Sequence, residues 1–202
     1  MARSVGLDKA AVVRAAAELA DIHGLDALTL GLVAEQLGIR TPSLYNHVAG
    51  LAGLRRELAL LCLGEVIDQL GTAVMGKSGD AAIHALAQAY RAYVLARPGL
   101  YATIIRAPEQ ADIELQQASA RLVEIILAAL SAYGLHDDDA IHAVRGLRSL
   151  VHGFATLEAA SGFGLALDRD ESFRRLVVMF IVGLREDKAN ERHGRSSHHR
   201  NC

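Results

Sequence analysis

Apolar residues recur every three to four positions along almost the whole chain, which is the spacing of one face of an α-helix. The first such row has Asp8 before it as a capping residue and Gly24 after it as a stop, and its inward members are Val12, Ala16 and Leu19. Short alternating runs of the kind that predict β-strands are nearly missing. The pattern therefore predicts an all-α protein.

The next two predicted helices are short and follow one another closely. The second occupies residues 30–37, with Thr29 as its cap and Gly38 as its stop. The third begins within "IRTPSLYNHV", where we expect Thr41 to cap the helix and Pro42 to take the first helical position, because the missing N–H of proline costs nothing there. Three short helices with a glycine turn before the third are typical of a helix-turn-helix domain.

The rest of the chain continues the helical pattern to a polar end. The remaining predicted helices cover residues 51–70, 80–96, 99–106, 109–133, 137–157 and 169–186. The last one contains "LVVMFIVGL", which is apolar on nearly all sides, so we expect a second subunit to cover its outer face. About nine helices result, and the expected domains are a helix-turn-helix domain at 1–50, a larger helical ligand-binding and dimerisation bundle at 51–186, and a disordered tail at 187–202.

Composition limits the classes of function that the chain can have. Of its 202 residues, 51% are hydrophobic and 22% are charged, which indicates a globular protein with a substantial core. The net charge of −2 excludes a general polycation, so nucleic-acid binding must come from a local surface. Cys62 and Cys202 are too few and too far apart for a disulfide framework. We see neither a signal peptide nor an apolar stretch of about 18 residues, so we expect a cytoplasmic protein with no membrane association.

The segment "GTAVMGKSG" at residues 71–79 matches the phosphate-loop pattern G-x-x-x-x-G-K-[ST]. That pattern binds phosphate only where a strand precedes it and a helix follows it, and here helical periodicity precedes it. We therefore interpret the segment as a linker between two helices and expect neither enzymatic activity nor a cofactor. A nucleotide hydrolase that uses Lys77 is the enzymatic alternative.

Two segments contain residue types that bind metals. "HDDDAIH" at residues 136–142 combines acids with histidines, but acids are favoured at a helix N-terminus by the helix dipole alone. The tail carries His198, His199 and Cys202, which could bind metal loosely, but we interpret it as a solvated tail. We therefore expect no metal site.

The candidate DNA-binding residues lie in and around the predicted third helix. In "LTLGLVAEQLGIRTPSLYNHV", Gly38 permits the turn, and the inward residues are Val33, Ala34, Leu37, Ile39 and Leu44. A recognition helix enters the major groove by its N-terminus, where short side chains let the backbone approach base edges. The residues at that N-terminus are Arg40, Thr41, Pro42 and Ser43. One turn later, Tyr45, Asn46 and His47 can donate hydrogen bonds to phosphates or bases.

At these residues the chain resembles the N-terminal domain of TetR-family (tetracycline repressor-like) transcriptional regulators. The turn and recognition helix of that family commonly read L-G-x-x-x-x-x-L-Y-x-H-[FV], and the matching residues are Gly38, Leu44, Tyr45, His47 and Val48. The resemblance covers residues 8–60. In addition, "VHGFATLE" at 151–158 is similar to a C-terminal domain type of this family with a Trp-His-Gly motif, although Val151 stands at the Trp position.

The resemblance implies that Thr29, Tyr45 and His47 hold DNA phosphates. The residues that it implies to face bases are Arg40, Thr41, Pro42, Ser43 and Asn46. The family often places a lysine near the start of the fourth helix, where this chain has residues 49–53, "AGLAG". Residues 1–60 also contain six basic and six acidic side chains, so the expected DNA-binding region has no net charge. Few ion pairs to DNA are therefore expected.

The resemblance further implies a homodimeric regulator with a ligand-sensing second domain. We expect a repressor that leaves a near-palindromic operator in double-stranded DNA when a small, largely apolar effector binds. The candidate ligand-binding residues are Tyr90, Tyr93, Tyr101, Ile104, His152, Phe154 and Phe163, all of which could instead be ordinary core residues. A helical ligand-binding or dimerisation protein with weak DNA affinity is the alternative.

Overall fold

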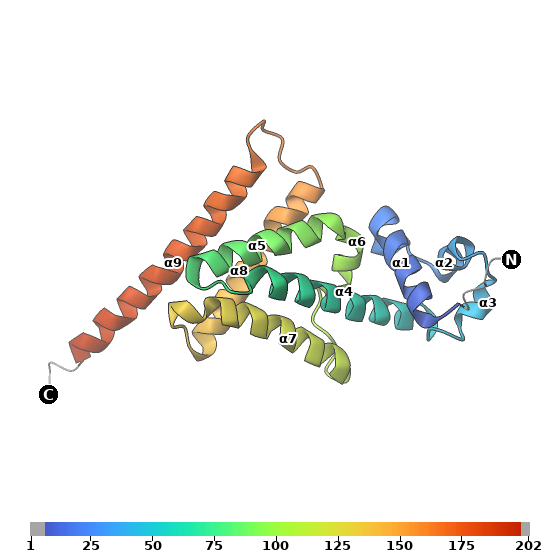
Figure 1. Ribbon diagram of the computed structural model, residues 1–202, viewed down its shortest axis with the longest axis horizontal. Helices are drawn as coiled ribbons and strands as arrows, with labels where there is room; N and C mark the ends of the chain where they lie inside the picture. Colours follow the sequence, from blue (N-terminus) through green and yellow to red (C-terminus); the bar gives the residue numbers. More distant parts are fainter. Residues whose placement is uncertain (1–6, 199–202) are drawn as a thin grey trace. The chain divides into compact units, whose positions relative to one another are not determined.

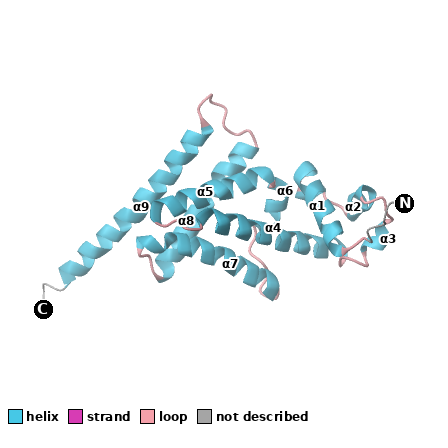
Figure 2. Cartoon of the chain, in the orientation of Figure 1, coloured by secondary structure: helices cyan, strands magenta, loops and turns pink. Residues whose placement is uncertain are grey.

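The chain folds into helices and connecting loops. The computed structural model describes residues 7–198, and within them Figure 2 shows no strand. The α-helices of this part of the chain are α1 Lys9–His23, α2 Leu30–Gln36, α3 Thr41–Leu44, α4 Gly50–Val74, α5 Gly79–Ala96, α6 Pro98–Tyr101, α7 Ile113–Leu130, α8 Asp137–Ala159 and α9 Arg169–His198 (Figure 1). Short 3-10 turns occur at η1 Leu25–Ala27, η2 Ala102–Ile104 and η3 Ser131–Tyr133. The expected all-α fold with about nine helices is confirmed.

The chain divides into two compact units. Unit 1 comprises Met1–Val66 and Ala96–Ala120, and unit 2 comprises Ile67–Leu95 and Arg121–Cys202. This division differs from the expected boundary at residue 50, because α6 and the first part of α7 belong to the same unit as the helix-turn-helix segment. The functional boundaries at residues 50 and 186 remain predictions.

Local sequence signals determine the ends of α1 and α2. Asp8 Oδ1 accepts a hydrogen bond from the Ala11 N–H at 2.7 Å, and Thr29 Oγ1 accepts one from the Leu32 N–H at 3.2 Å. Each side chain therefore satisfies a backbone donor that has no partner within its helix. Gly38 follows α2 with φ 65°, a conformation that favours glycine. The caps predicted at Asp8 and Thr29 and the turn at Gly38 are confirmed.

Other predicted boundaries were wrong. Arg40, not Thr41, occupies the N-cap of α3, and Pro42 is the second helical residue. The α-helix ends at Leu44, and tight backbone turns continue through Val48. The backbone of Arg40 has the extended conformation of an N-cap residue, but its side chain makes no capping hydrogen bond to α3.

Several helices differ in length from the prediction, among them the helix expected at 99–106, which is α6 Pro98–Tyr101 followed by the 3-10 turn Ala102–Ile104. Helix α4 continues beyond residue 70 to Val74, so Gly71 of the phosphate-loop pattern lies inside a helix. Helix α9 continues beyond residue 186 to His198, through most of the tail expected to be disordered; residues 199–202 lie outside the described part of the chain. Helix α7 begins at Ile113 rather than at residue 109.

Unit 1 contains a core that supports the helix-turn-helix segment. Helix α1 packs against both α2 and α6, and α2 packs against α3. Fully buried side chains of this core include Val12, Ala16, Ala17, Val33, Leu44, Leu54 and Leu58. Because these residues occupy the inward positions of four helices, burial of their apolar surface fixes α2 and α3 on a firm base.

Helices α1 and α6 meet backbone to backbone at the α1–α6 joint, defined by Ala20, Asp21, Arg97, Gly99 and Leu100. A Cβ atom added to Gly99 would lie 1.8 Å from the Ala20 carbonyl oxygen, so only glycine fits. The Asp21 carboxylate accepts one hydrogen bond from the Leu100 N–H at 2.8 Å and another from Arg97 Nε at 2.6 Å. Asp21 of α1 therefore supplies the N-terminal cap of α6.

Unit 2 has its own core around α5, α8 and α9. Its fully buried side chains include Ile83, Leu86, Leu130, Leu147, Val151 and Phe173. In the described part of α9, residues 169–186, the buried residues are Phe173, Val177, Ile181 and Leu184, which recur at helical spacing on one face. Met179 and Val182 of the same helix are 62% and 44% exposed. Helix α9 thus has an inner apolar face that packs within its own unit and an outer apolar surface that is exposed.

Candidate nucleic-acid interface

Two buried anchors determine which way the segment at residues 40–47 faces. Leu44 is fully buried and Val48 is 5% exposed, so these residues fasten the segment to the core of unit 1. The residues between and before them lie outward: Arg40, Pro42, Tyr45 and Asn46 are exposed, and Thr41, Ser43 and His47 are half-buried. The anchors therefore turn the side chains of the expected DNA-binding residues toward solvent.

The polar groups of this surface are not used inside the protein. Within the described side chains of residues 7–186, those of Arg40, Tyr45 and Asn46 have no hydrogen-bond or ion-pair partner. Tyr45 is 62% exposed, so its ring does not serve as a core residue. A guanidinium, a phenol hydroxyl and a carboxamide are therefore all free to bind an external partner.

Thr29, which precedes residues 40–47 in the sequence and is also expected to contact DNA, has a structural role as well. Its hydroxyl oxygen accepts the N–H of Leu32, as described above. A hydroxyl that accepts one hydrogen bond still has a proton to donate. Capping of α2 and donation to a phosphate are therefore compatible in one side chain.

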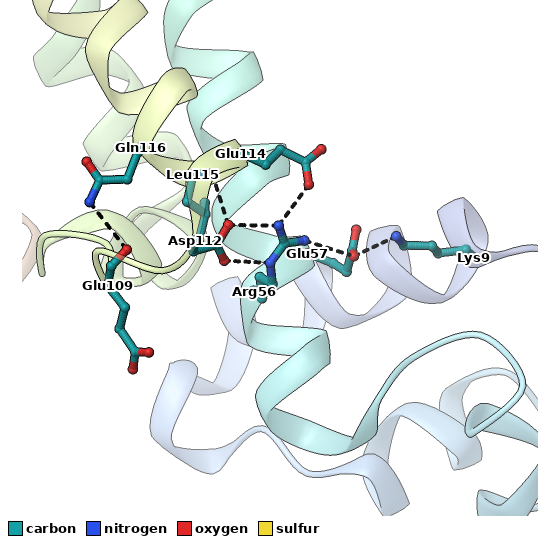
Figure 3. A network of polar contacts seen from close by, with 8 residues as sticks. All are labelled: Lys9, Arg56, Glu57, Glu109, Asp112, Glu114, Leu115 and Gln116. Atoms are coloured by element: carbon teal, nitrogen blue, oxygen red, sulfur yellow. Dashed lines mark hydrogen bonds and ion pairs between the residues drawn. The ribbon is translucent and has the colours of Figure 1, made fainter.

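Most other cations of the helix-turn-helix region are held by partners within unit 1. Figure 3 shows Arg56 in the centre of a network of acids. Its Nε and Nη2 donate to the two oxygens of Asp112 at 2.6 and 2.8 Å, and Nη2 also donates to Glu114 at 2.8 Å. Lys9 pairs with Glu57 at 2.5 Å, and Arg55 Nη2 donates to the Leu25 carbonyl at 3.2 Å.

This network changes the proton affinity of its members. The hydrogen bonds from Arg56 hold the pKa of Asp112 below its ordinary value, and the hydrogen bonds from Asp112 and Glu114 raise the pKa of Arg56. Asp112 also accepts the Leu115 N–H at 3.2 Å, which caps α7. Because these charges neutralise one another, Arg14 and Arg40 are the exposed cations without an internal partner in residues 7–60.

The structure divides the expected ligand-binding residues between the two units. Tyr101 and Ile104 belong to unit 1, and the others, Tyr90, Tyr93, His152, Phe154 and Phe163, belong to unit 2. Tyr90 and Tyr93 are buried, His152 and Phe154 are half-buried, and Phe163 is 37% exposed in the loop between α8 and α9. Within unit 2, the rings of Phe154 and Phe163 lie 4.7 Å apart, so the structure brings these two together.

Unit 2 also contains a buried charge that the sequence analysis missed. Arg91 of α5 is 6% exposed and binds both oxygens of Glu158 at 2.7 Å and one oxygen of Asp170 at 2.7 Å. Its guanidinium lies 4.9 Å from the ring centre of Phe173 and 5.4 Å from that of Phe154. The hydrogen bonds to Glu158 raise the pKa of Arg91. We call these five residues the Arg91 cluster.

The segments considered for phosphate or metal chemistry have ordinary structural roles. Residues 71–74 form the last turn of α4, and Lys77 Nζ donates to the Ala73 carbonyl at 2.8 Å. Among the side chains that the structure describes, those of residues 7–186, no three of His, Cys, Asp or Glu lie together in a way that could hold a metal ion. The side chain of His198 and the residues His199 and Cys202 lie outside the described part of the chain.

The same part of the chain has no single helix that is long and apolar enough to cross a membrane. One bent pair, Ile113–Tyr133 with Asp137–Ala159, satisfies the length and composition of a span only when the two helices are combined.

Comparison with known proteins identifies the chain as a helix-turn-helix transcriptional regulator. It is 36% identical to YobS of Bacillus subtilis (strain 168), an uncharacterized HTH-type transcriptional regulator, over 91% of this chain and 96% of the relative. It is 34% identical to Rv0681 of Mycobacterium tuberculosis (strain ATCC 25618 / H37Rv), another uncharacterized HTH-type transcriptional regulator, over 91% of this chain and 84% of the relative.

The C-terminal half narrows this class to one family. Residues 83–180 match the family model of the tetracyclin repressor-like C-terminal domain. The fold is similar to that of TetR from Acinetobacter baumannii AYE, with a TM-score of 0.68 at 21% identity, over 91% of this chain and 99% of that one. The chain belongs to the TetR family of transcriptional regulators.

Proposed function

We propose that this regulator is a homodimeric repressor that binds a near-palindromic operator through residues 40–47 and leaves it when a small, largely apolar effector binds unit 2. The observation that carries the DNA-binding part is the exposed set of uncommitted donors held outward by Leu44 and Val48. Arg40, Thr41, Pro42, Ser43 and Asn46 face bases. Thr29, Tyr45 and His47 hold phosphates, and no step requires catalysis.

The charge distribution sets the character of DNA binding. Since Lys9, Arg55 and Arg56 have partners inside unit 1, few cations per subunit neutralise phosphates. The affinity for DNA therefore depends weakly on salt, with a slope of log K against log salt of roughly −2 to −4 for a dimer. Recognition relies on hydrogen bonds to bases and on the two-fold symmetry of the operator.

Dimerisation is supported by the outer surface of α9. Met179 and Val182 are exposed on a helix whose opposite face is already buried. Exposed apolar side chains of this kind are covered when the last two long helices of two subunits pack as a four-helix bundle. The dimer also supplies two recognition segments, one for each half-site.

DNA binding is tested by fluorescence anisotropy with labelled DNA from immediately upstream of the gene, at two salt concentrations and with excess nonspecific DNA. Arg40→Ala is expected to weaken operator binding roughly 5- to 150-fold, which is the range for loss of one base contact. Arg106→Ala, an equal charge change at an exposed site of unit 1, is expected to leave the affinity unchanged. Tyr45→Phe removes only a hydroxyl and is expected to weaken binding about tenfold.

Two results would contradict this assignment. Equal losses in Arg40→Ala and Arg106→Ala would indicate nonspecific charge attraction. Binding no tighter than that to competitor DNA, including DNA sites selected from random sequence, would favour the alternative of a helical ligand-binding or dimerisation protein with weak DNA affinity. The observation that favours this alternative is the small number of cations in residues 7–60 that have no partner inside the protein.

The oligomeric state is tested separately by sedimentation velocity. Met179→Glu is expected to convert the dimer to a monomer, because it places a charge in the centre of the apolar outer surface of α9. Met75→Glu makes the same change at a methionine that is 75% exposed in the turn after α4, and it is expected to leave the dimer intact. A dimer that persists in Met179→Glu would exclude this surface as the interface.

A further inference from the structure

The Arg91 cluster has two carboxylates that differ greatly in their access to water. The side chain of Glu158 is 10% exposed and binds Nε and Nη2 of Arg91 in a bidentate manner. The side chain of Asp170 is 82% exposed and binds only Nη1. Glu158 is therefore a fixed counter-ion of the buried guanidinium, whereas Asp170 occupies its outermost donor from the solvent side.

The Asp170 contact is easily exchanged. The side chain of Asp170 is 82% exposed, so water solvates its carboxylate when it leaves Nη1. Another carboxylate can therefore take the place of Asp170 on Nη1 at small cost. The buried donor has to keep some acceptor, however, since an unpaired N–H of a buried guanidinium is strongly unfavourable.

Exposed apolar side chains lie in the same part of unit 2. Phe163 is 37% exposed while its ring contacts that of Phe154, which in turn lies 5.4 Å from the Arg91 guanidinium. Leu157, the residue before Glu158, is 53% exposed and lies against the backbone of the α8–α9 loop near Gly162. An exchangeable carboxylate position beside exposed aromatic and aliphatic surface matches a ligand with one acidic end and an apolar body.

We propose that Arg91 is the anchor of an effector site for small apolar monocarboxylic acids, whose carboxylate replaces that of Asp170 on Nη1 and whose apolar body covers Phe163. This inference rests on the proposed function, since it names the chemical class of the effector. Asp170 lies in the first turn of α9, so its displacement removes one of the contacts between the start of that helix and α5. The effector thereby acts on the helix that we assign to dimerisation.

The test is isothermal titration calorimetry of the full-length protein with 3-phenylpropionate and octanoate. 3-Phenylpropan-1-ol has the same apolar body as the first acid without its charge. Saturable binding of at least one acid, with the alcohol at least tenfold weaker, is expected. Equal binding of acid and alcohol, or no binding of either acid at millimolar concentration, would overturn the proposal.

Two variants show whether Asp170 and Arg91 have the proposed roles. Asp170→Ala removes the internal competitor and is expected to bind the acid roughly two- to fivefold more tightly, because the acid no longer has to displace a solvated carboxylate from Nη1. The control Asp138→Ala removes an exposed acid from the first turn of α8 and is expected to bind as the wild type does. Weaker or unchanged binding in Asp170→Ala would contradict the proposal.

Arg91→Lys keeps the charge but loses the donors that bind Glu158 and Asp170 together, and it is expected to abolish acid binding. If that variant does not fold, the comparison between Asp170→Ala, expected to bind the acid more tightly, and Asp138→Ala, expected to bind as the wild type does, still decides the question. Operator binding without acid, measured on the same preparation, separates this proposal from the proposed function. Selective operator binding with no acid binding refutes only the effector site, whereas acid binding without operator binding refutes the repressor.

Discussion

The α1–α6 joint of unit 1 and the Arg91 cluster of unit 2 both fasten helices together, but they are built in opposite ways. At the joint, two backbones touch, and the position of a single added Cβ atom would lie 1.8 Å from a carbonyl oxygen. In the cluster, a long guanidinium side chain spans the distance between α5, the end of α8 and the start of α9. The α1–α6 joint leaves no room for a larger side chain at the contact, whereas the Arg91 cluster consists of side chains that can be replaced together.

The comparison shows how tolerance to mutation follows from the kind of contact. A backbone contact is lost as soon as either backbone moves, since no rotamer change relieves it. A buried ion pair is different, because its Coulomb attraction only offsets the cost of removing both charges from water. Replacement of one partner should therefore be severe, and replacement of both should be mild.

The largest expected effect comes from Gly99→Ala. The new methyl group overlaps the Ala20 carbonyl, so α1 and α6 must separate, and we expect a loss of about 5 kcal/mol in unfolding free energy or failure to fold. Urea unfolding followed by circular dichroism measures this change. Gly64→Ala, where nothing lies within 4 Å of the added Cβ, is the matched control and should be neutral or slightly stabilising. Similar stability of the two variants would disprove the close contact.

Arg91→Ala is expected to cost about 3–5 kcal/mol, because the buried carboxylate of Glu158 loses its bidentate partner and keeps only the longer 3.8 Å contact with Arg169. The same unfolding experiment measures it. Arg174→Ala removes an exposed arginine of α9 that pairs with Glu171 and serves as the control. A loss as small as that of the control would mean that water reaches the cluster freely.

The double variant Arg91→Met/Glu158→Leu sharpens the comparison. Two apolar side chains of similar size remove both charges together, so we expect at least about 2 kcal/mol of the loss in Arg91→Ala to be recovered. A double-mutant cycle with the two single variants measures the recovery. A loss that is simply the sum of the single losses would refute the view that the cluster can be replaced as a unit.

Asp21→Ala weakens the α1–α6 joint without introducing a clash. It removes the cap of α6 and the ion pair with Arg97, and an expected loss of about 1–2 kcal/mol follows. Asp21→Asn should recover part of this loss, because the amide oxygen still accepts the Leu100 N–H. Thermal unfolding of the three proteins checks the order; equal stability of the two variants would show that only the charge matters.

The smallest effect is expected from Arg56→Ala, whose side chain is 36% exposed. We expect the melting temperature at neutral pH to change by at most about 2 °C, and less at high salt. The pH dependence is more informative. Because Arg56 lowers the pKa of Asp112, the folded state gains stability above the ordinary value of 3.8 and loses it as the pH falls through the lower folded value. The free energy of unfolding, measured between pH 5 and pH 2, should therefore decrease less with falling pH in Arg56→Ala than in the wild type.

Features set by neighbouring residues could be predicted from the sequence. Asp8 and Thr29 cap helices that begin directly after them, and Gly38 forms the turn, because each depends on a local backbone conformation. The outward residues from Arg40 to His47 followed from the same local pattern, although their contacts with DNA remain a prediction. The N-cap of α3 was placed one residue too late, since Arg40 starts that helix without a capping side chain.

Features set by distant residues could not be predicted. Arg91 meets Glu158 and Asp170, which lie 67 and 79 positions away along the chain, and no local pattern distinguishes it from a solvated arginine. The sequence also gave no sign that Asp21 caps a helix that begins at Pro98. Helix α9 extends past residue 186 because a polar segment without proline can remain helical, so polarity alone was a poor indicator of disorder.

The contact at Gly99 also constrains how this protein can evolve. Every single-base change in a glycine codon that alters the amino acid introduces a residue with a Cβ atom or ends translation, so no single step leads away from this position without disturbing α1. The pair Arg91–Glu158 is constrained differently. Substitution of either residue alone leaves the other as a buried charge without this partner, whereas substitution of both together avoids that cost. Lineages that share this fold should therefore keep the glycine outright, and should exchange the ion pair for apolar residues only at both positions together.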